Sequence, residues 1–496
     1  MYNWTDEQEL IFDTLTEKVK SLNNNNKTEI ISIEAVAGSS KSTSLVESAN
    51  RMLKENNKLN IRYIVFGSAN AKEAKEKFDS RVIVSTTNSL AYNITKRDYD
   101  INTDIRPFIT WKDIPKKLKI PYWDIYTALN IVNEYLSSSG SLEDAIETIR
   151  LKDIYIKPST EKAANNILEA MHNKEMPITH SYYLKLFHSE MLQGTLNLPE
   201  VDVLMLDEVN DVTEQTLDIF KMYPAKLKIM VGDSHQAIHK WMGCVNAFKL
   251  ITPDTTLHLS QSFRVSDKIA PRIEYFCKRY LNPNFDFLGF TYNNNMLPQT
   301  HAYISRTNSN MLDTMIQLHM TNTPYKLATR EKLKQLFDIP LAILAAPGFK
   351  QKNPTLKHIQ EVIDNWSKLS EHNRPSKFKA IMEEFKDDMN ITSAIKVIIK
   401  YGPTEVINII NNASKIIRDD ATITLLTAHT SKGLTFDEVT ITDEMNESIE
   451  EILLLKDIYI AKGNFPVLTN EEEEALNLYY VACSRCRLKL NNAKHL

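Results

Sequence analysis

The sequence predicts an α/β protein with two parallel-sheet cores, each interrupted by a mostly helical insertion. Short apolar runs alternate with helical patterns, which is typical of parallel sheets whose crossovers are helices. A loop at 36–40 follows the first apolar run, and a carboxylate pair, Asp207 and Glu208, follows a later one. Because ligands bind at the carboxyl ends of strands in such sheets, both features fall where a site is expected.

Length and composition describe an ordinary globular protein of several domains. The chain has 496 residues, of which 43% are hydrophobic and 25% charged. No apolar stretch reaches membrane-spanning length, so no membrane partner is expected. The start of the chain is polar and acidic rather than a secretory signal, and only four cysteines occur, so we expect an intracellular, cytoplasmic protein. The low glycine count of 11 beside abundant Asn and Lys is compatible with a virus-encoded protein.

The first core is expected over 1–99 and 179–256. A helical spacing of apolar residues over 5–22 predicts a helix with Thr5 as its N-cap. Strands are predicted at 30–34, 61–66, 81–85, 202–206 and 227–231. The proline-containing stretch 100–178, with helical patterns near 123–136 and 142–150, predicts an inserted helical subdomain.

The second core is expected over 257–308 and 416–496. Strand patterns occur at 302–305, 422–427 and 438–442, and a final helix is expected to begin within 471–474. The polar stretch 309–415 predicts a second, mostly helical insertion.

The loop after the first strand resembles a phosphate-binding loop. Lys41 is expected to approach the β- and γ-phosphates of a nucleotide, and Ser42 and Asp207 are expected to hold Mg²⁺. The loop residues expected to contact phosphate are Gly38, Ser39, Ser40, Lys41, Ser42 and Thr43. Ser40 stands where the usual pattern has glycine, so a weakened or inactive site is the alternative.

Further motifs, in order along nearly the whole chain, resemble superfamily 1 helicases of the UvrD/Rep type, and most closely the F-box DNA helicase branch. The stretch 207–211, Asp-Glu-Val-Asn-Asp, is similar to the family's Asp-Glu-Ala-Gln-Asp. The segments 232–238, 259–264, 426–434 and 479–485 resemble later motifs of the same family. The resemblance implies two RecA-like cores with ATP and Mg²⁺ bound between them.

The resemblance also implies roles for single residues in ATP hydrolysis. Glu208 would polarise the attacking water, and Gln8 would read the adenine edge, to which a carboxamide can both donate and accept. Gln236 would sense the γ-phosphate. The remaining expected contacts with nucleotide come from Phe263, Arg264, Gly433 and Arg485, the two arginines as γ-phosphate ligands.

Several segments resemble DNA contacts of the family. Trp241 stands where the family stacks a base, although ordinary core packing is the alternative. Asn88 replaces a histidine of the family's pattern. The expected contacts are Phe66, Asn70, Thr87, Asn88, Trp241, Thr427 and His429.

The predicted function is an ATP-dependent helicase or translocase on single-stranded DNA and single-strand/duplex junctions, with 3′→5′ travel implied by the resemblance. Two alternatives stay open: a nucleic-acid-binding module with a degenerate ATPase, and an RNA-directed enzyme of the same superfamily. The departures at Ser40, Asn88, Met242 and Thr435 favour the first alternative. The sequence names no protein partner.

Overall fold

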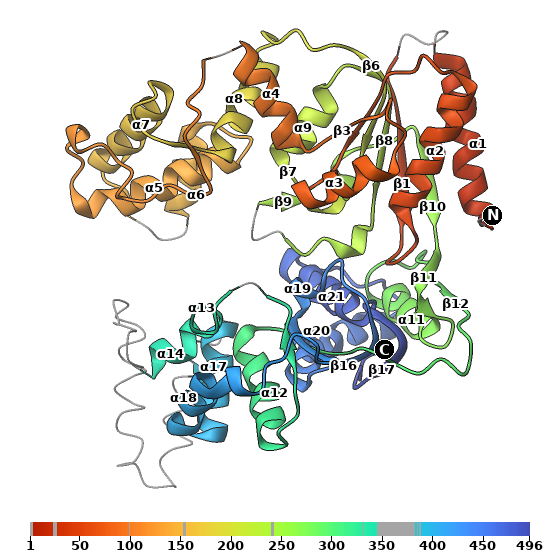
Figure 1. The fold of residues 1–496 in the computed structure, drawn as a ribbon, viewed down its shortest axis with the longest axis vertical. Coiled ribbons are helices and arrows are strands. Elements are labelled where there is room, and N and C mark those ends of the chain that lie inside the picture. The colour runs from red at the N-terminus through yellow and green to blue at the C-terminus, as the bar shows by residue number, and fades with distance from the viewer. Residues whose placement is uncertain are drawn as a thin grey trace. The chain divides into compact units, whose positions relative to one another are not determined.

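The computed structural model describes residues 3–22, 27–98, 100–151, 155–239, 243–329, 331–344, 382–383, 385 and 388–496 (Figure 1). The chain forms two compact units, Met1–Ser260 and Gln261–Leu496. Among the described helices, none is both long and apolar enough to cross a membrane. The predicted α/β class with two parallel-sheet cores is confirmed, because each unit contains one parallel sheet.

The sheet of the first unit has six parallel strands in the order β10-β1-β8-β6-β2-β3. The strands are β1 (Glu29–Ala35), β2 (Ile61–Ile64), β3 (Ile83–Ser85), β6 (Val201–Leu206), β8 (Ala225–Gly232) and β10 (Thr255–Leu259). The central strands β1, β6 and β8 are buried at most of their positions because helices cover both faces. All five strands predicted for this part of the chain are present.

Helices pack on both faces of this sheet. On one face, α1 (Asp6–Ser21) and α2 (Lys41–Glu55) share a core with β1 and β8. The α1 helix begins at the predicted N-cap, where Thr5 and Gln8 form a capping box. The other helices of the unit's main body are α3 (Ser68–Lys77), α4 (Thr87–Asp98), α8 (His180–Leu192), α9 (Glu214–Met222) and α10 (Ala247–Leu250).

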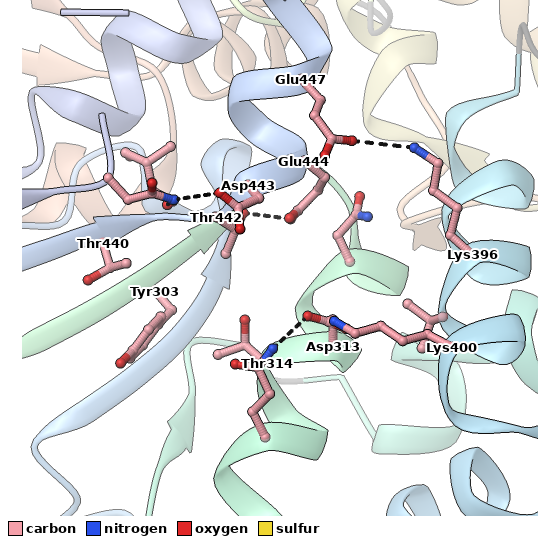
Figure 2. A pocket seen from close by; sticks show the side chains of 15 residues that line it. Tyr303, Asp313, Thr314, Lys396, Lys400, Thr440, Thr442, Asp443, Glu444 and Glu447 are labelled. Atoms are coloured by element: carbon pink, nitrogen blue, oxygen red, sulfur yellow. Dashed lines mark hydrogen bonds and ion pairs between the residues drawn. The ribbon is translucent and has the colours of Figure 1, made fainter. Parts of the chain in front are cut away.

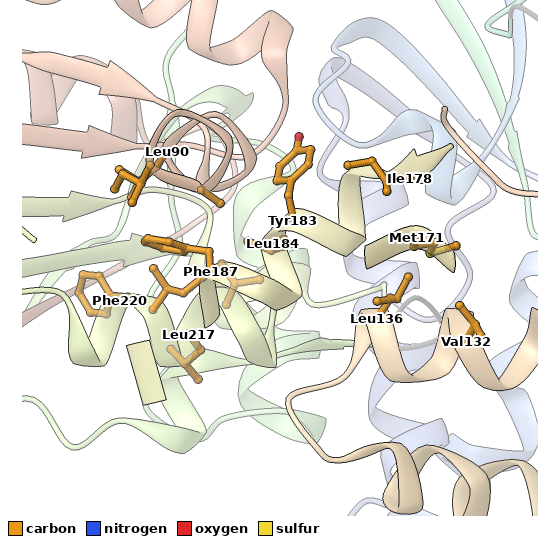
Figure 3. Packing of buried hydrophobic residues seen from close by; sticks show 14 of the residues in the cluster. Leu90, Val132, Leu136, Met171, Ile178, Tyr183, Leu184, Phe187, Leu217 and Phe220 are labelled. Atoms are coloured by element: carbon orange, nitrogen blue, oxygen red, sulfur yellow. The ribbon is translucent and has the colours of Figure 1, made fainter. Parts of the chain in front are cut away.

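The first insertion is helical, as expected. It contains α5 (Tyr122–Ser137), α6 (Leu142–Arg150) and α7 (Pro158–His172), and it is bounded by β4 (Ile105–Arg106) and β5 (Ile178–Thr179), which pair in parallel. Its apolar core is continuous with the core under α8 and α9 (Figure 3). Consequently the insertion and the sheet of the first unit share one hydrophobic core.

A buried lysine joins this insertion to α8. Lys185 Nζ donates hydrogen bonds to the carbonyl oxygens of Ser138, at 2.9 Å, and of Gly140. Gln215 on α9 donates to the Ser138 oxygen at 2.7 Å and to the Leu136 oxygen at 3.1 Å. These two side chains satisfy carbonyl groups at the end of α5, which would otherwise lack intrahelical partners.

The sheet of the second unit has five parallel strands in the order β14-β15-β13-β16-β17. The strands are β13 (His301–Ser305), β14 (Lys326–Leu327), β15 (Ile423–Thr427), β16 (Phe436–Ile441) and β17 (Cys486–Asn491). A separate two-stranded sheet joins β11 (Gln261–Ser266) and β12 (Leu288–Phe290). The helices of the sheet layer are α11 (Ala270–Tyr280), α12 (Asn308–Met320), α19 (Ala428–Ser431), α20 (Asp443–Ala461) and α21 (Asn470–Cys483).

Helices also form the described part of the second insertion. They are α13 (Leu333–Leu336), α14 (Asp338–Ile343), α17 (Met389–Tyr401) and α18 (Pro403–Asn412), and they bury their apolar residues against α12 and β15.

Two predicted boundaries differ from the structure. The first unit extends to Ser260 rather than to 256, because β10 pairs with β1 and so belongs to the first sheet. The last helix begins at Asn470 rather than within 471–474, because Thr469 and Glu472 form a capping box that sets its first turn.

Candidate active site and strand-binding cavity

The loop at 36–40 connects β1 to α2 in the geometry of a phosphate-binding loop. Gly38 and Ser40 both adopt positive φ angles, of 77° and 62°. Lys41 is the first residue of α2, so the unpaired amides of this helix N-terminus surround it. The Ser39 hydroxyl is buried and makes no hydrogen bond with the described residues. A polar cradle of this kind fits a phosphate group.

The carboxylate pair lies beside this loop, because the sheet places β6 close to β1, with only β8 between them. Ser42 Oγ donates a hydrogen bond of 3.0 Å to Asp207 Oδ2. Lys41 Nζ lies 3.7 Å from Glu208 Oε1. The structure therefore brings together the four residues predicted for phosphate, Mg²⁺ and water. A serine hydroxyl beside a carboxylate oxygen also suits Mg²⁺, which prefers oxygen ligands.

Tyr63 is part of this site and has no counterpart among the predicted residues. It lies on β2, is buried, and donates a hydrogen bond of 2.5 Å to Asp207 Oδ2. Burial and the neighbouring Glu208 raise the pKa of Asp207, whereas the bond from Tyr63 and the charge of Lys41 lower it. One signal was available in the sequence: a tyrosine in a buried strand needs a partner for its hydroxyl.

Gln236, also in the first unit, is held by hydrogen bonds with Asp233 and Asn210. Its amide donates a hydrogen bond of 2.6 Å to Asp233 Oδ2. Asn210 donates to the Gln236 carbonyl oxygen at 3.2 Å and accepts from the Asp233 amide at 3.1 Å. Gly232 lies against this asparagine, because a Cβ at Gly232 would stand 2.7 Å from Asn210 Oδ1. Asn210, where the family's pattern has Gln, thus joins the carboxylate segment to Gln236.

Gln8 is buried against α2 rather than exposed for recognition. Its Oε1 accepts from the Thr5 amide at 3.0 Å, and its Nε2 donates to Ser44 Oγ at 2.9 Å. Its position near the phosphate loop agrees with the predicted neighbourhood. To read an adenine edge, Gln8 would have to replace one of these two hydrogen bonds with a bond to the base.

A cavity of about 820 Å³ lies beside the carboxylate pair of the first unit, because Asp207 is one of its lining residues. Segments far apart in the sequence line it, among them residues within 65–68, 86–89, 180–184 and 212–216, together with Asp207. Phe66 is 60% exposed, and Thr87 and Asn88 occupy the first turn of α4. The structure therefore gathers predicted strand contacts around one cavity. Asn70 does not line it, because its amide donates to the Phe66 carbonyl oxygen.

The two predicted arginines of the second unit meet at Ser484. Arg264 lies on β11, beside Phe263, and its Nη1 donates to the Ser484 carbonyl oxygen at 3.5 Å. Arg485 is buried; its Nε donates to the Val481 carbonyl oxygen and its Nη2 to Ser484 Oγ, both at 2.9 Å. Burial of so large a charged group is unusual without a specific role.

The last predicted contacts lie at the carboxyl end of β15. Thr427 caps α19 by accepting from the Thr430 amide, and His429 follows in that helix, partly buried. Gly433 adopts a φ of 82°, which favours glycine. Trp241 lies outside the described residues.

The second unit also contains a pocket of about 410 Å³, in which two lysines are paired with carboxylates (Figure 2). Lys400 Nζ lies 2.7 Å from Asp313 Oδ1, and Lys396 Nζ lies 3.5 Å from Glu447 Oε2. Burial raises the pKa of Glu444, which accepts a hydrogen bond from Thr442. Because α17 supplies both lysines, these pairs connect the second insertion to α12 and α20.

Metal-ligand clusters of His, Cys, Asp and Glu are absent from the part of the chain that the structure describes. The spacing of Cys483 and Cys486 suits zinc in principle, but both thiols are buried. Burial raises the pKa of Cys486 to about 12, so these cysteines are packing residues.

The parallel sheet, the phosphate loop after β1 and the carboxylate pair after β6 identify the first unit as a phosphate-loop α/β unit. Residues 15–251, within the first unit, match the model of the UvrD/REP helicase N-terminal domain family, so the predicted resemblance to that family is confirmed.

Two relatives align with most of the chain. The F-box DNA helicase protein 1 of Schizosaccharomyces pombe is 22% identical, over 94% of this chain and 55% of its own length. The F-box DNA helicase 1 of Gallus gallus is 24% identical, over 94% of this chain and 48% of its own length. The chain thus spans about half the length of these relatives.

Proposed function

We propose that this protein is an ATP-hydrolysing DNA helicase or translocase that moves along single-stranded DNA. The position of Asp207 carries the proposal. Its carboxylate accepts from Ser42 of the phosphate loop, and the same residue lines the cavity of the first unit. A single side chain therefore contacts both the candidate nucleotide site and the candidate strand site. Similarity to two DNA helicases supports the same function.

In the proposed hydrolysis, Lys41 faces the charge of the β- and γ-phosphates, and Ser42 and Asp207 would hold Mg²⁺. Bound Mg²⁺ neutralises charge that develops on the phosphate oxygens. Glu208 orients the attacking water and accepts its proton. Lys41 Nζ and Glu208 Oε1 lie 3.7 Å apart, so a phosphate group held by Lys41 would lie close to a water molecule oriented by Glu208. We extend the proposal to Arg264 and Arg485, which would stabilise transition-state charge.

In the proposed strand site, Phe66 offers an exposed ring on which a base can stack, and Thr87 and Asn88 offer hydrogen bonds. Base stacking on an aromatic ring tolerates any sequence, as a translocating enzyme requires. Travel in the 3′→5′ direction is proposed from the family resemblance.

Steady-state ATP hydrolysis tests this function. The parent protein is assayed alone, with a single-stranded oligodeoxynucleotide and with RNA of the same sequence. We expect stimulation by DNA, no hydrolysis by Lys41→Ala, and reduced DNA stimulation in Phe66→Ala. Stronger stimulation by RNA would favour the RNA-directed alternative. Strand binding without hydrolysis would favour the degenerate module.

Direction and unwinding need a separate assay. Forked duplexes with a 3′ or a 5′ overhang are mixed with the parent protein and ATP, and released strand is measured. We expect release from the 3′ overhang; release only from the 5′ overhang would contradict the proposed direction.

A further inference from the structure

Five large aromatic side chains in the stretch 105–126 of the first insertion are exposed. The exposed fractions are 68% for Phe108, 55% for Trp111, 72% for Tyr122, 73% for Trp123 and 75% for Tyr126. The stretch contains β4, the 3₁₀ turn Lys116–Leu118 and the start of α5, which Figure 1 labels. Three of the five rings lie within the first five residues of α5.

The same stretch is anchored by its aliphatic residues. Ile109 is buried in the core of the first insertion, and further aliphatic side chains pack against that core. These are Ile105, Ile114, Leu118, Ile120 and Ile125. Aromatic rings usually contribute most to a core because they bury the largest apolar area. Here the aliphatic residues face inward and the aromatic ones remain in solvent, which marks an interaction surface.

The exposed charges of this stretch are basic. Lys112 Nζ lies 5.7 Å from the centroid of the Trp111 ring. Lys116 and Lys119 are exposed, and no described carboxylate lies within ion-pair distance of them or of Lys112. The acidic residues of the stretch are compensated: Asp113 pairs with Arg106, and Asp124 is buried and accepts from Thr160 at 2.7 Å. This local charge contrasts with the net charge of −4 for the whole chain.

The combination of exposed aromatic rings and lysines favours a nucleic-acid partner over a protein partner. Protein interfaces are enriched in Tyr and Trp but depleted in Lys. Surfaces for single-stranded nucleic acid combine stacking rings with basic groups that follow the backbone. Ile105, at the start of the stretch, lines the cavity of the first unit. A strand leaving the cavity can therefore continue along β4 towards the exposed rings.

We propose that a second site for single-stranded DNA lies on the first insertion, formed by Trp111, Tyr122, Trp123 and Tyr126 with Lys112, Lys116 and Lys119. We call this set the aromatic–lysine surface. It binds bases by stacking and phosphates by charge, without sequence preference. The inference rests on the proposed function, because it extends the path of the strand that the enzyme would follow.

Equilibrium binding of labelled oligothymidylates to the full chain tests the proposal. One oligonucleotide is short enough to fill the cavity alone, and the other is several times longer. The alanine variant combines Trp111→Ala, Trp123→Ala and Tyr126→Ala, and its matched control replaces the same residues with Phe. We expect the alanine variant to bind the long strand about tenfold more weakly or worse, with the short strand little affected. The phenylalanine control keeps a stacking face at each position and should bind like the parent.

A third variant, Lys112→Gln, Lys116→Gln and Lys119→Gln, tests the charge. The slope of log affinity against log salt concentration for the long strand should decrease by about 0.7 for each phosphate that the variant no longer neutralises. An unchanged slope, or equal losses of affinity in the alanine and phenylalanine variants, would overturn the proposal. A further outcome would also overturn the proposal: the parent sediments as a dimer, and the alanine variant is monomeric but still binds the long strand. In that case the aromatic–lysine surface would be covered by a second copy of the chain.

These outcomes are separable from failure of the proposed function. A parent protein that lacks DNA-stimulated hydrolysis would contradict the proposed function. Binding is measured without ATP, so the affinities of the variants for the long strand would still test the aromatic–lysine surface.

Discussion

The hydroxyl of Tyr63 donates a hydrogen bond of 2.5 Å to Oδ2 of Asp207, the same oxygen that accepts from Ser42. Two donors on one buried carboxylate oxygen favour its charged form. They oppose the burial and the Glu208 charge that raise the pKa of Asp207. Tyr63 is therefore placed as a positioning residue whose hydrogen bond favours the carboxylate form of Asp207, the form that the proposed Mg²⁺ site would need.

Replacing Tyr63 with Phe removes one donor and keeps the ring. The pKa of Asp207 should rise further, so the loss of ATPase activity on acidification should begin at a higher pH than in the parent. A hydrogen bond to a charged group is worth about 1.5–3 kcal/mol, so we expect a rate near neutrality that is lower by a factor of roughly 10 to 150. The pH profile of hydrolysis at several Mg²⁺ concentrations checks this. If the rate falls equally at every pH and the loss of activity on acidification begins at the same pH as in the parent, Tyr63 has only a packing role.

Lys41→Ala and Glu208→Gln should separate binding from turnover. In the proposed site Lys41 carries the charge that faces phosphate, so its loss should weaken both nucleotide affinity and hydrolysis. Glu208→Gln keeps the shape of the side chain but cannot accept a proton, so affinity should persist while turnover falls by about 10²-fold or more. Nucleotide binding and single-turnover hydrolysis measure the two effects. Parent-like turnover in either variant means that the site is wrongly assigned.

Ser40→Gly should be tolerated or beneficial. Ser40 adopts the left-handed conformation, which costs a residue with a Cβ about 1–2 kcal/mol. Glycine avoids that cost but loses about 0.5–1 kcal/mol more in backbone entropy, so the net stabilisation should be small. Melting temperature and ATPase rate should be equal to the parent's or slightly higher. A parent without hydrolysis that only this substitution restores would favour the degenerate module.

Lys185→Met should change how stability depends on pH. Burial lowers the pKa of Lys185 to about 8, from a usual 10.5. Between these values the unfolded chain binds a proton that the folded chain has released, so the contribution of Lys185 to stability increases as the pH rises and is lost as it falls. The parent's stability relative to Lys185→Met should therefore rise by roughly 1–3 kcal/mol from about pH 7 to about pH 10.

Thermal unfolding at both pH values measures this difference. Lys226→Met is the matched control, because the hydrogen bond from Lys226 to Asp202 raises the pKa of that lysine. The control should show no such gain over the same range. A pH-independent difference for Lys185→Met would mean that its ammonium group is not desolvated.

The sequence by itself determined the elements and the chemistry that neighbouring residues encode. Apolar runs predicted β1, β2, β3, β6 and β8 of the first sheet and β13, β15 and β16 of the second, and Thr5 as an N-cap predicted the start of the first helix. The loop before Lys41 and the pair Asp207 and Glu208 were recognisable because each is a continuous motif. Local physics sufficed for these features, since their signals lie within a few residues of each other.

Only the tertiary structure decided relationships between distant residues. Tyr63 and Asp207 are 144 positions apart, and no local pattern reveals that β2 and β6 are neighbours in the sheet. The same reason applies to β10, which pairs with β1 from the far end of the first unit. The exposure of Trp123 and Tyr126 could not be predicted from the sequence. Aromatic residues at helical spacing are expected in the core, and only the packing of neighbouring elements shows that these two are exposed.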